Sequence, residues 1–203
     1  MRWTLTMISL LAVLALVACD LIPPAGDDDD DDDSVPDQPV LANGDFEELD
    51  NAGTFFLHWN NYDDNPDGQI RVAEEGCHEG QRCVQFAIDA QGDGWEYFLT
   101  QGQIDPAKLV PGTHYALTGA FKASSDVSEI SFNYILRGDG MDDIGNDWDD
   151  THPSSVGAWE PFRFEFTIPE DAGPSNYTLY LHLIKWNELD VDLWVDDVAF
   201  EEA

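Results

Sequence analysis

Apolar and polar residues alternate in several short stretches between residues 69 and 200. The even-numbered residues from 162 to 168 are Phe or Ile, and the residues between them are Arg, Glu and Thr. Residues 84–88 and 179–183 alternate in a similar way. A period of two with one apolar face predicts antiparallel strands that pack on a shared core. The predicted strands are rich in β-branched and aromatic residues, end near Gly, Pro, Asn or Asp, and span residues 69–73, 83–88, 95–100, 114–122, 129–137, 161–168, 177–186 and 192–200.

These strands predict an all-β fold. No stretch of residues 40–203 has the apolar spacing of an amphipathic helix, although residues 105–110 could form one turn. About eight or nine strands in roughly 160 residues predict a two-sheet antiparallel β-sandwich or jelly roll. The length of residues 40–203 fits one domain.

The N-terminus has the pattern of a secretory signal. Arg2 precedes an almost continuous apolar run at residues 7–17, which is too short to cross a membrane as a helix. The run leads into Leu16-Val17-Ala18-Cys19, which is similar to the lipobox of bacterial lipoproteins. We therefore expect residues 1–18 to be a signal peptide and Cys19 to carry a lipid that anchors the chain to the bacterial cell envelope. The outer membrane or cell surface is favoured over the inner membrane; the alternative is an ordinary signal peptide with a chance cysteine.

Residues 19–39 read as an acylated cysteine followed by a tether. Four prolines interrupt regular structure, and residues 27–33 are consecutive Asp residues that repel one another. We expect a disordered, solvated spacer that lifts the domain away from the membrane. A sorting signal for surface export and a loose calcium-binding segment are the alternatives.

The strongly acidic charge restricts the classes of partner that the chain can bind. The chain has 8 Lys and Arg against 42 Asp and Glu, a net charge of −34. Removing residues 1–39 takes away one basic and nine acidic residues, which leaves a net charge of −26. The few remaining cations cannot form a phosphate-binding patch, which excludes nucleic acid and disfavours anionic glycans. Neutral ligands or divalent cations are favoured, and the membrane is expected to be reached through the lipid alone.

The domain contains the cysteines Cys77 and Cys83. In an exported protein this spacing predicts one small-loop disulfide. Gly76 and Gly80 favour the tight closure. Zinc is disfavoured, because His78 is the one other nearby ligand and the compartment is oxidising.

Short motifs then occur in an order that resembles one family. They are LANGDFE at 41–47, CVQF at 83–86, VPGTHYALTG at 110–119, WEPF at 159–162, FTIP at 166–169 and LWVDDVAF at 193–200. This order resembles the carbohydrate-binding modules of families 4, 9 and 22, which have a galactose-binding-like β-sandwich. The resemblance covers nearly all of residues 41–200. It implies a module that binds neutral polysaccharide or oligosaccharide, although a fold alone does not fix a ligand.

The resemblance also implies a structural Ca²⁺ that joins the first and last strands. Its ligands would come from Asp45 or Glu47, from Glu79 and from Asp196. Calcium takes six to eight oxygen ligands, and clustered carboxylates repel one another without a cation. Glu47 and Asp196 are the strongest candidates, and Asp45 would contribute its carbonyl. The alternative is that these acids lie at strand ends on the surface.

Two further acidic stretches stand out. Residues 63–74 match the EF-hand loop pattern, but no predicted helices flank them and Pro66 lies inside, so we expect an ordinary turn.

Residues 138–158 form a long predicted loop with six Asp residues around Trp148. We expect either a solvated loop or a lid over a ligand groove, with Trp148 as a platform.

A sugar-binding site needs flat apolar surfaces for ring faces and fixed polar groups for hydroxyls. We expect both on the outward face of one concave sheet. The candidate ligand-binding residues are Trp95, Asn133, Arg137, Trp148, Tyr180, His182 and Trp186. For each aromatic residue, a place in the core is the alternative.

The sequence does not predict an enzyme. The domain has no GxSxG, no HExxH, no phosphate loop and no lone reactive cysteine, and the 5 His residues lack metal-ligand spacing. Carboxylates are so abundant that a pair of them carries no information about glycoside hydrolysis. We expect a monomeric, non-catalytic binding module. The alternative is a structural or protein-interaction β-sandwich lipoprotein without a sugar site.

Overall fold

The computed structural model describes residues 39–62, 69–88, 96–125, 130–146, 151–186 and 190–203. The predicted signal peptide, Cys19 and nearly all of the tether lie outside the described residues. So do Trp95, Trp148 and the first half of the EF-hand-like stretch, residues 63–68.

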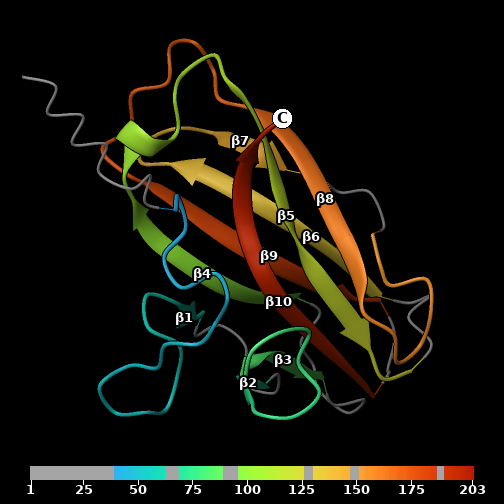
Figure 1. Cartoon of the computed structure of the whole chain (residues 1–203). Helices are drawn as coiled ribbons and strands as arrows, with labels where there is room; N and C mark the ends of the chain where they lie inside the picture. Colours follow the sequence, from blue (N-terminus) through green and yellow to red (C-terminus); the bar gives the residue numbers. More distant parts are fainter. Residues whose placement is uncertain (1–38, 63–68, 89–95, 126–129, 147–150, 187–189) are drawn as a thin grey trace, which may run out of the picture. The chain divides into compact units, whose positions relative to one another are not determined.

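The strands form two five-stranded antiparallel sheets that lie face to face (Figure 1). The first sheet contains, in spatial order, β1 (Asn60–Asn61), β4 (Glu96–Ile104), β9 (Tyr177–Lys185), β6 (Ile130–Gly138) and β7 (Asp143–Asn146). The second contains β2 (Gln69–Ala73), β3 (Cys83–Ile88), β10 (Val191–Glu202), β5 (His114–Ala123) and β8 (Glu160–Thr167). A short 3-10 helix, η1 (Pro106–Lys108), follows β4. The predicted all-β sandwich is confirmed.

The predicted strands correspond to eight of the strands observed in the described residues. The other two, β1 and β7, are 2 and 4 residues long, too short for an alternating pattern to be visible in the sequence. β4 continues to Ile104, four residues beyond its predicted end, because a bulge lets the strand pass an irregular register between Gln101 and Ile104.

Aromatic rings from both sheets fill the core. Phe132 on β6 is fully buried, and its ring centroid lies 5.2–6.4 Å from those of four rings of the second sheet: Phe86, Phe121, Phe162 and Phe164. Rings at these separations gain attraction beyond the burial of their area. Phe132 is therefore a central contact between the two sheets.

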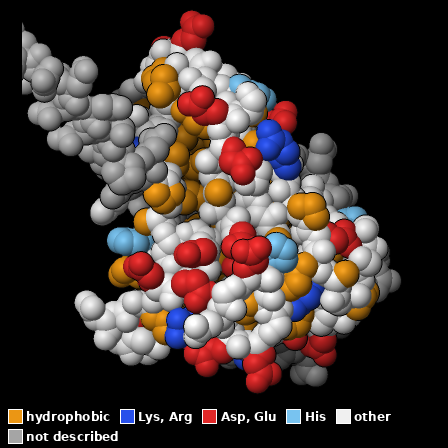
Figure 2. Space-filling view, viewed as in Figure 1, with side chains coloured by type: hydrophobic (Ala, Val, Ile, Leu, Met, Phe, Trp, Pro, Cys, Tyr) orange, Lys and Arg blue, Asp and Glu red, His pale blue; other side chains and the backbone are white. Residues whose placement is uncertain are grey.

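The surface carries the charge that the composition predicts. Acidic side chains are spread over the face seen in Figure 2, with few basic side chains between them. Such a surface repels anionic ligands at low ionic strength.

Candidate functional site

The outward face of the first sheet is built from rows of residues that cross β4, β9 and β6. Phe98, His182 and Asn133 lie opposite one another in one row. The next row consists of Thr100, Tyr180 and Ile135. Residues two apart along a strand share a face, and the intervening residues of these strands belong to the core, so both rows project away from the core.

Three aromatic rings on this face surround a hollow of about 140 Å³. We call it the aromatic hollow; it is lined by Tyr62, Phe98, Ile135, Arg137 and Tyr180. The ring centroids of Tyr62, Phe98 and Tyr180 lie 5.8–6.4 Å from one another. Tyr62 is 46% exposed, and Phe98 and Tyr180 are partly exposed. The hollow therefore offers apolar ring surface to solvent.

Arg137 supplies fixed polar groups beside these rings. Its Nε donates to Asp143 Oδ1 at 2.7 Å, and its guanidinium carbon lies 5.7 Å from the Tyr180 ring centroid. The hydrogen bond to Asp143 raises the pKa of Arg137 above its ordinary value. The guanidinium is therefore held in place and remains charged at every physiological pH.

His182 and Asn133 lie within the same sheet but are fully buried. The His182 ring stacks on Phe98, with centroids 4.2 Å apart and an interplanar angle of 11°. Burial lowers the pKa of His182 to about 4, so the imidazole is neutral at pH 7. His182 thus packs against a ring that lines the aromatic hollow, and neither of these two predicted ligand residues is exposed.

The structure brings together some of the other predicted ligand residues. Arg137 and Tyr180 both line the aromatic hollow. Trp186 follows the end of β9 and is 50% exposed. Trp95 and Trp148 lie outside the described residues.

The sequence reasoning missed Tyr62, Phe98 and Ile135. Phe98 lies in a stretch with apolar residues on both faces, and Ile135 is the one apolar residue on the polar face of its strand. Tyr62 follows β1, which was not predicted. Phe98, within the predicted strand at 95–100, was the available signal for an aromatic site. The pairing of β1 with β4, which brings Tyr62 beside Phe98, was needed to recognise it.

The candidate metal ligands lie at the loop between β2 and β3. Asp196 on β10 is fully buried. Its Oδ2 accepts hydrogen bonds from the backbone N–H groups of His78 (3.0 Å) and Glu79 (3.3 Å). Its Oδ1 accepts a hydrogen bond from the backbone N–H of Asp197 (3.0 Å). Burial, followed by the charge of Asp197, raises the pKa of Asp196 to about 6. A nearby cation would favour the charged form of this carboxyl group.

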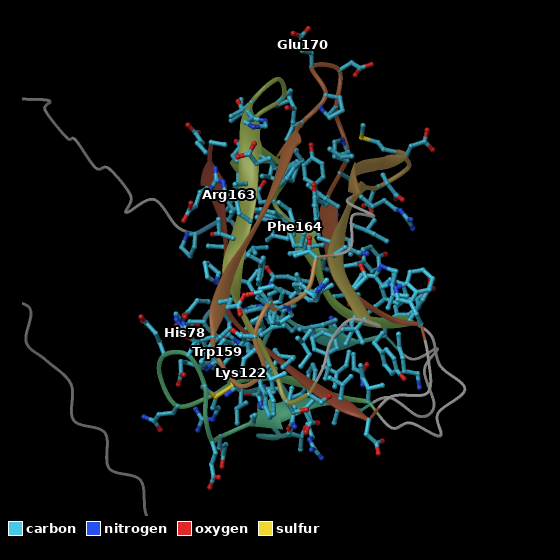
Figure 3. All side chains as sticks on the ribbon, turned by 90° about the vertical axis from the view of Figure 1, so that its right-hand side faces the viewer. His78, Lys122, Trp159, Arg163, Phe164 and Glu170 are labelled. Atoms are coloured by element: carbon cyan, nitrogen blue, oxygen red, sulfur yellow. A yellow bond between two sulfur atoms is a disulfide. The ribbon has the colours of Figure 1, made fainter. Side chains whose placement is uncertain are left out.

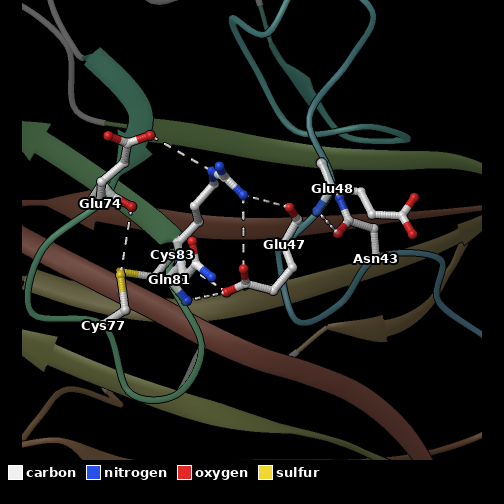
Figure 4. Close-up of polar contacts among 9 residues, drawn as sticks. Asn43, Glu47, Glu48, Glu74, Cys77, Gln81 and Cys83 are labelled. Atoms are coloured by element: carbon white, nitrogen blue, oxygen red, sulfur yellow. Dashed lines mark hydrogen bonds and ion pairs between the residues drawn. A yellow bond between two sulfur atoms is a disulfide. The ribbon is translucent and has the colours of Figure 1, made fainter.

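Glu47 reaches the same loop from the first described segment (Figure 4). Its Oε1 accepts from the backbone N–H of Gln81 at 2.6 Å and of Arg82 at 2.9 Å. Glu47 and Asp196 therefore connect the beginning and the end of the domain through residues 78–82. Asp45 and Glu79 are exposed.

Two groups of possible metal ligands occur among the described residues, each with ligand atoms within 4.8 Å of one another. One is Cys77, Cys83 and Asp196, and the other is His78, Glu79 and Asp197. The predicted ligand Glu79 is thus grouped with His78 and Asp197, whereas Asp196 is grouped with the cysteines. Cys77 and Cys83 form a disulfide, as predicted.

The disulfide loop is also fixed to the second sheet. The Lys122 ammonium and the Trp159 indole N–H both donate to the backbone carbonyl of Gly76. The ammonium lies 4.8 Å from the Trp159 ring centroid and 4.6 Å from that of Trp194 (Figure 3). The two hydrogen bonds hold the loop beside β5, and the cation–π contacts hold the Lys122 ammonium between the two indole rings.

None of the helices in the described part of the chain is long and apolar enough to cross a membrane.

Several solved structures share the fold. TmCBM61 in complex with β-1,4-galactotriose has a TM-score of 0.54 and 13% identity, covering 82% of this chain and 99% of that one. A cyclase from Fischerella sp. TAU has a TM-score of 0.59 and 17% identity, with 80% and 96% covered. The arabinose-bound MgGH51 α-L-arabinofuranosidase has a TM-score of 0.58 and 11% identity, with 80% and 26% covered. The fold thus occurs both in binding modules and in enzymes.

Comparison of the sequence with known proteins and with family models bears on whether the chain is a binding module or an enzyme. No curated protein sequence matches the chain. The model of the family CBM_4_9, described as a carbohydrate binding domain, matches residues 38–189, which is more than half of the chain. Domains of this family are typically non-catalytic. The chain therefore belongs to the CBM_4_9 family of carbohydrate binding domains.

Proposed function

We propose that the chain is a non-catalytic module that captures neutral glycans through the aromatic hollow. The observation that carries the proposal is the group of three aromatic rings, open to solvent, beside the fixed guanidinium of Arg137. Sugar ring faces pack on aromatic side chains, and sugar hydroxyls bind fixed donors and acceptors. The net charge of −26 for residues 40–203 disfavours acidic glycans.

The groups around the aromatic hollow support binding rather than catalysis. Arg137 is already bound to Asp143. Burial keeps the neighbouring His182 neutral at pH 7 and out of contact with solvent. A general acid or base must reach a substrate proton with a suitable pKa, and neither group does so here.

The test is affinity electrophoresis of the full chain through gels that contain β-1,4-galactan, xylan, mixed-linkage β-glucan or mannan. β-1,4-Galactan is included because TmCBM61 was solved with β-1,4-galactotriose. We expect retardation by at least one neutral polysaccharide and none by polygalacturonate at the same concentration. Migration unchanged in every neutral gel would contradict the proposal. It would favour the alternative of a structural or protein-interaction sandwich.

A structural Ca²⁺ is part of the proposal. Glu47 and Asp196 would hold it, since both reach residues 78–82 and Asp196 is a buried carboxylate with a raised pKa. Their oxygen atoms suit this hard cation, whose charge would offset the cost of burying Asp196. Asp45 and Glu79 are exposed, and we assign them at most a peripheral part.

Calcium is expected to raise the thermal stability of the full chain. A ligand that binds the folded state at ten times its Kd adds about 1.4 kcal/mol, which raises the Tm by roughly 3–6 °C for a domain of this size. Differential scanning calorimetry in EGTA and in CaCl₂ measures the shift. Asp196→Asn should abolish the shift, and Asp45→Asn, at an exposed carboxylate, should retain it. An equal Tm in EGTA and CaCl₂ for the unaltered chain would exclude the ion.

The module is further proposed to be held at the bacterial cell envelope by a lipid on Cys19. The support is the sequence alone: the apolar run before Cys19, the small residue Ala18, and the acidic stretch that follows. Such a tether would leave the glycan-binding face free to reach polymers near the membrane. Labelling with a radioactive fatty acid, lost in Cys19→Ser, tests it.

A further inference from the structure

The aromatic hollow contains a cation, although the domain around it is strongly acidic. Among the residues that line the hollow, Arg137 is the one that carries a charge. Arginine binds carboxylates well, because its planar guanidinium can donate two parallel hydrogen bonds to one carboxylate. An unpaired arginine beside aromatic rings would therefore favour acidic sugars, such as uronates. A site for neutral glycans has to offset the charge of this arginine.

Asp143 supplies the opposite charge. It lies on β7, an edge strand of the first sheet, and it is the register partner of Arg137 on β6. Its Oδ1 accepts the hydrogen bond from Arg137 Nε at 2.7 Å. Opposite charges that face each other across an antiparallel pair stabilise the pairing. The ion pair is therefore built into the β6–β7 hairpin.

A bulge in β7 selects the residue that faces Arg137. Leu136 on β6 pairs with Gly145 on β7. Regular antiparallel pairing would then bring Ile144 opposite Arg137, but the register shifts by one residue and brings Asp143 there. Bulges commonly redirect side chains at binding sites. This bulge places a carboxylate, in place of an apolar side chain, next to the guanidinium.

The ion pair lies at the surface, beside the rings. The side chain of Arg137 is 50% exposed and that of Asp143 is 28% exposed. The guanidinium carbon lies 5.7 Å from the ring centroid of Tyr180, which lines the same hollow. A sugar that packs on Tyr180 therefore lies within reach of the guanidinium and of the carboxylate that neutralises it.

The hydrogen bond at Nε restricts what the guanidinium can bind. A guanidinium presents its donors in a fixed fork, and Asp143 already uses the Nε donor. A second carboxylate at the terminal nitrogens would lie close to the carboxylate of Asp143, and like charges at short range repel each other. A sugar hydroxyl group has no such penalty, since it can accept from the guanidinium and donate to the carboxylate.

We propose that Asp143 is a specificity-determining residue: by neutralising Arg137, it makes the aromatic hollow bind neutral sugars and exclude uronates. This inference rests on the proposed glycan-binding function of the hollow. The net charge of the domain adds a less specific bias, because salt screens charges that lie beyond a Debye length of about 8 Å at physiological ionic strength. The contact between Asp143 and Arg137 is far shorter than this length. Discrimination at physiological salt therefore depends mainly on Asp143.

Asp143→Asn tests the inference, and Asp142→Asn is the matched control. An amide at position 143 can still accept the hydrogen bond from Nε, so the substitution removes the charge and keeps the support of the guanidinium. Asp142 is exposed, and no ion pair joins it to Arg137 in the described part of the chain. The two variants share the change in net charge and differ in their contact with Arg137. Differential scanning calorimetry shows whether each remains folded.

Isothermal titration calorimetry of the full chain, in about 0.15 M NaCl, compares neutral tetrasaccharides with uronate tetrasaccharides. The neutral probes are those of β-1,4-linked mannose, glucose, xylose and galactose, and the uronate probes are those of mannuronate, glucuronate and galacturonate. We expect the unaltered chain and Asp142→Asn to prefer the best neutral probe over every uronate by about 30-fold or more. Asp143→Asn should reduce this preference by about tenfold or more, because the freed guanidinium gains a charge-assisted hydrogen bond to the uronate.

A double variant assigns the gain to the guanidinium. In Arg137→Gln combined with Asp143→Asn, the gain in uronate affinity should disappear. A gain that persists without Arg137, an equal gain in Asp142→Asn, or no gain in folded Asp143→Asn would overturn the role of Asp143 and leave the aromatic hollow standing. So would an unaltered chain that binds a uronate as tightly as a neutral probe. An unaltered chain that binds none of the neutral probes would overturn the proposed function itself, and the inference with it.

Discussion

Replacing Tyr180 with Ala is expected to weaken glycan binding about 30-fold to 100-fold, which corresponds to roughly 2–3 kcal/mol, the range of an interface hot spot. Tyr180 lines the aromatic hollow and is in ring contact with Phe98 and Tyr62, and the Arg137 guanidinium lies over its ring. Its loss removes ring surface and also the support of the guanidinium. Calorimetric titration with the oligosaccharide that binds the unaltered chain measures the change.

Two control variants distinguish the loss of a sugar-binding ring from a general disturbance of the domain. Tyr180→Phe keeps the ring and should retain binding within about threefold, which is below 1 kcal/mol. Trp194→Ala removes a half-buried aromatic ring from the second sheet, beside Lys122, and should leave affinity unchanged. If Tyr180→Ala binds as tightly as the unaltered chain, the glycan lies elsewhere and the assignment of the aromatic hollow is wrong.

Replacing Phe132 with Ala is expected to lower the free energy of unfolding by about 3–5 kcal/mol. Phe132 is fully buried and contacts four aromatic rings of the opposite sheet. Alanine would leave a cavity between the sheets, and the strands on either side are held by hydrogen bonds that limit collapse. Urea denaturation followed by tryptophan fluorescence measures the change, with the dependence on urea expected to stay constant.

The matched control is Phe200→Ala. Phe200 is partly buried and packs on Phe166 near the C-terminal end of β10, so the expected loss is below about 2 kcal/mol. A loss at Phe132 no larger than that at Phe200 would show that the space between the sheets can collapse after truncation.

Predictions from the sequence worked best where a strand has one apolar face. β8 alternates strictly, and its buried residues Phe162, Phe164 and Phe166 are those that the pattern predicts. In β4, by contrast, Tyr97 and Leu99 point into the core while Phe98 forms part of the aromatic hollow. All three residues are apolar or aromatic, so the pattern could not tell the two faces apart.

On the polar faces of β6 and β9, some of the residues predicted to be exposed are exposed and others are buried. Arg137 and Tyr180 meet at the aromatic hollow, as expected for neighbours on an outward face. Asn133 and His182 lie on the same face by alternation, yet both are fully buried. Alternation assigns a residue to a face, but exposure depends on what packs over that face.

The sequence by itself determined the all-β class, most of the strands, the disulfide between Cys77 and Cys83, and the family, because these follow from local periodicity and from motifs that are contiguous in the chain. Only the tertiary structure decided which side chains share a surface. Tyr62 meets Tyr180, and Gly102 lies opposite Thr178, across more than 70 residues of chain, through the pairing of β1 and β9 with β4. Those contacts depend on strand order and register, and the short strand and the bulge that set them leave no periodic signal in the sequence.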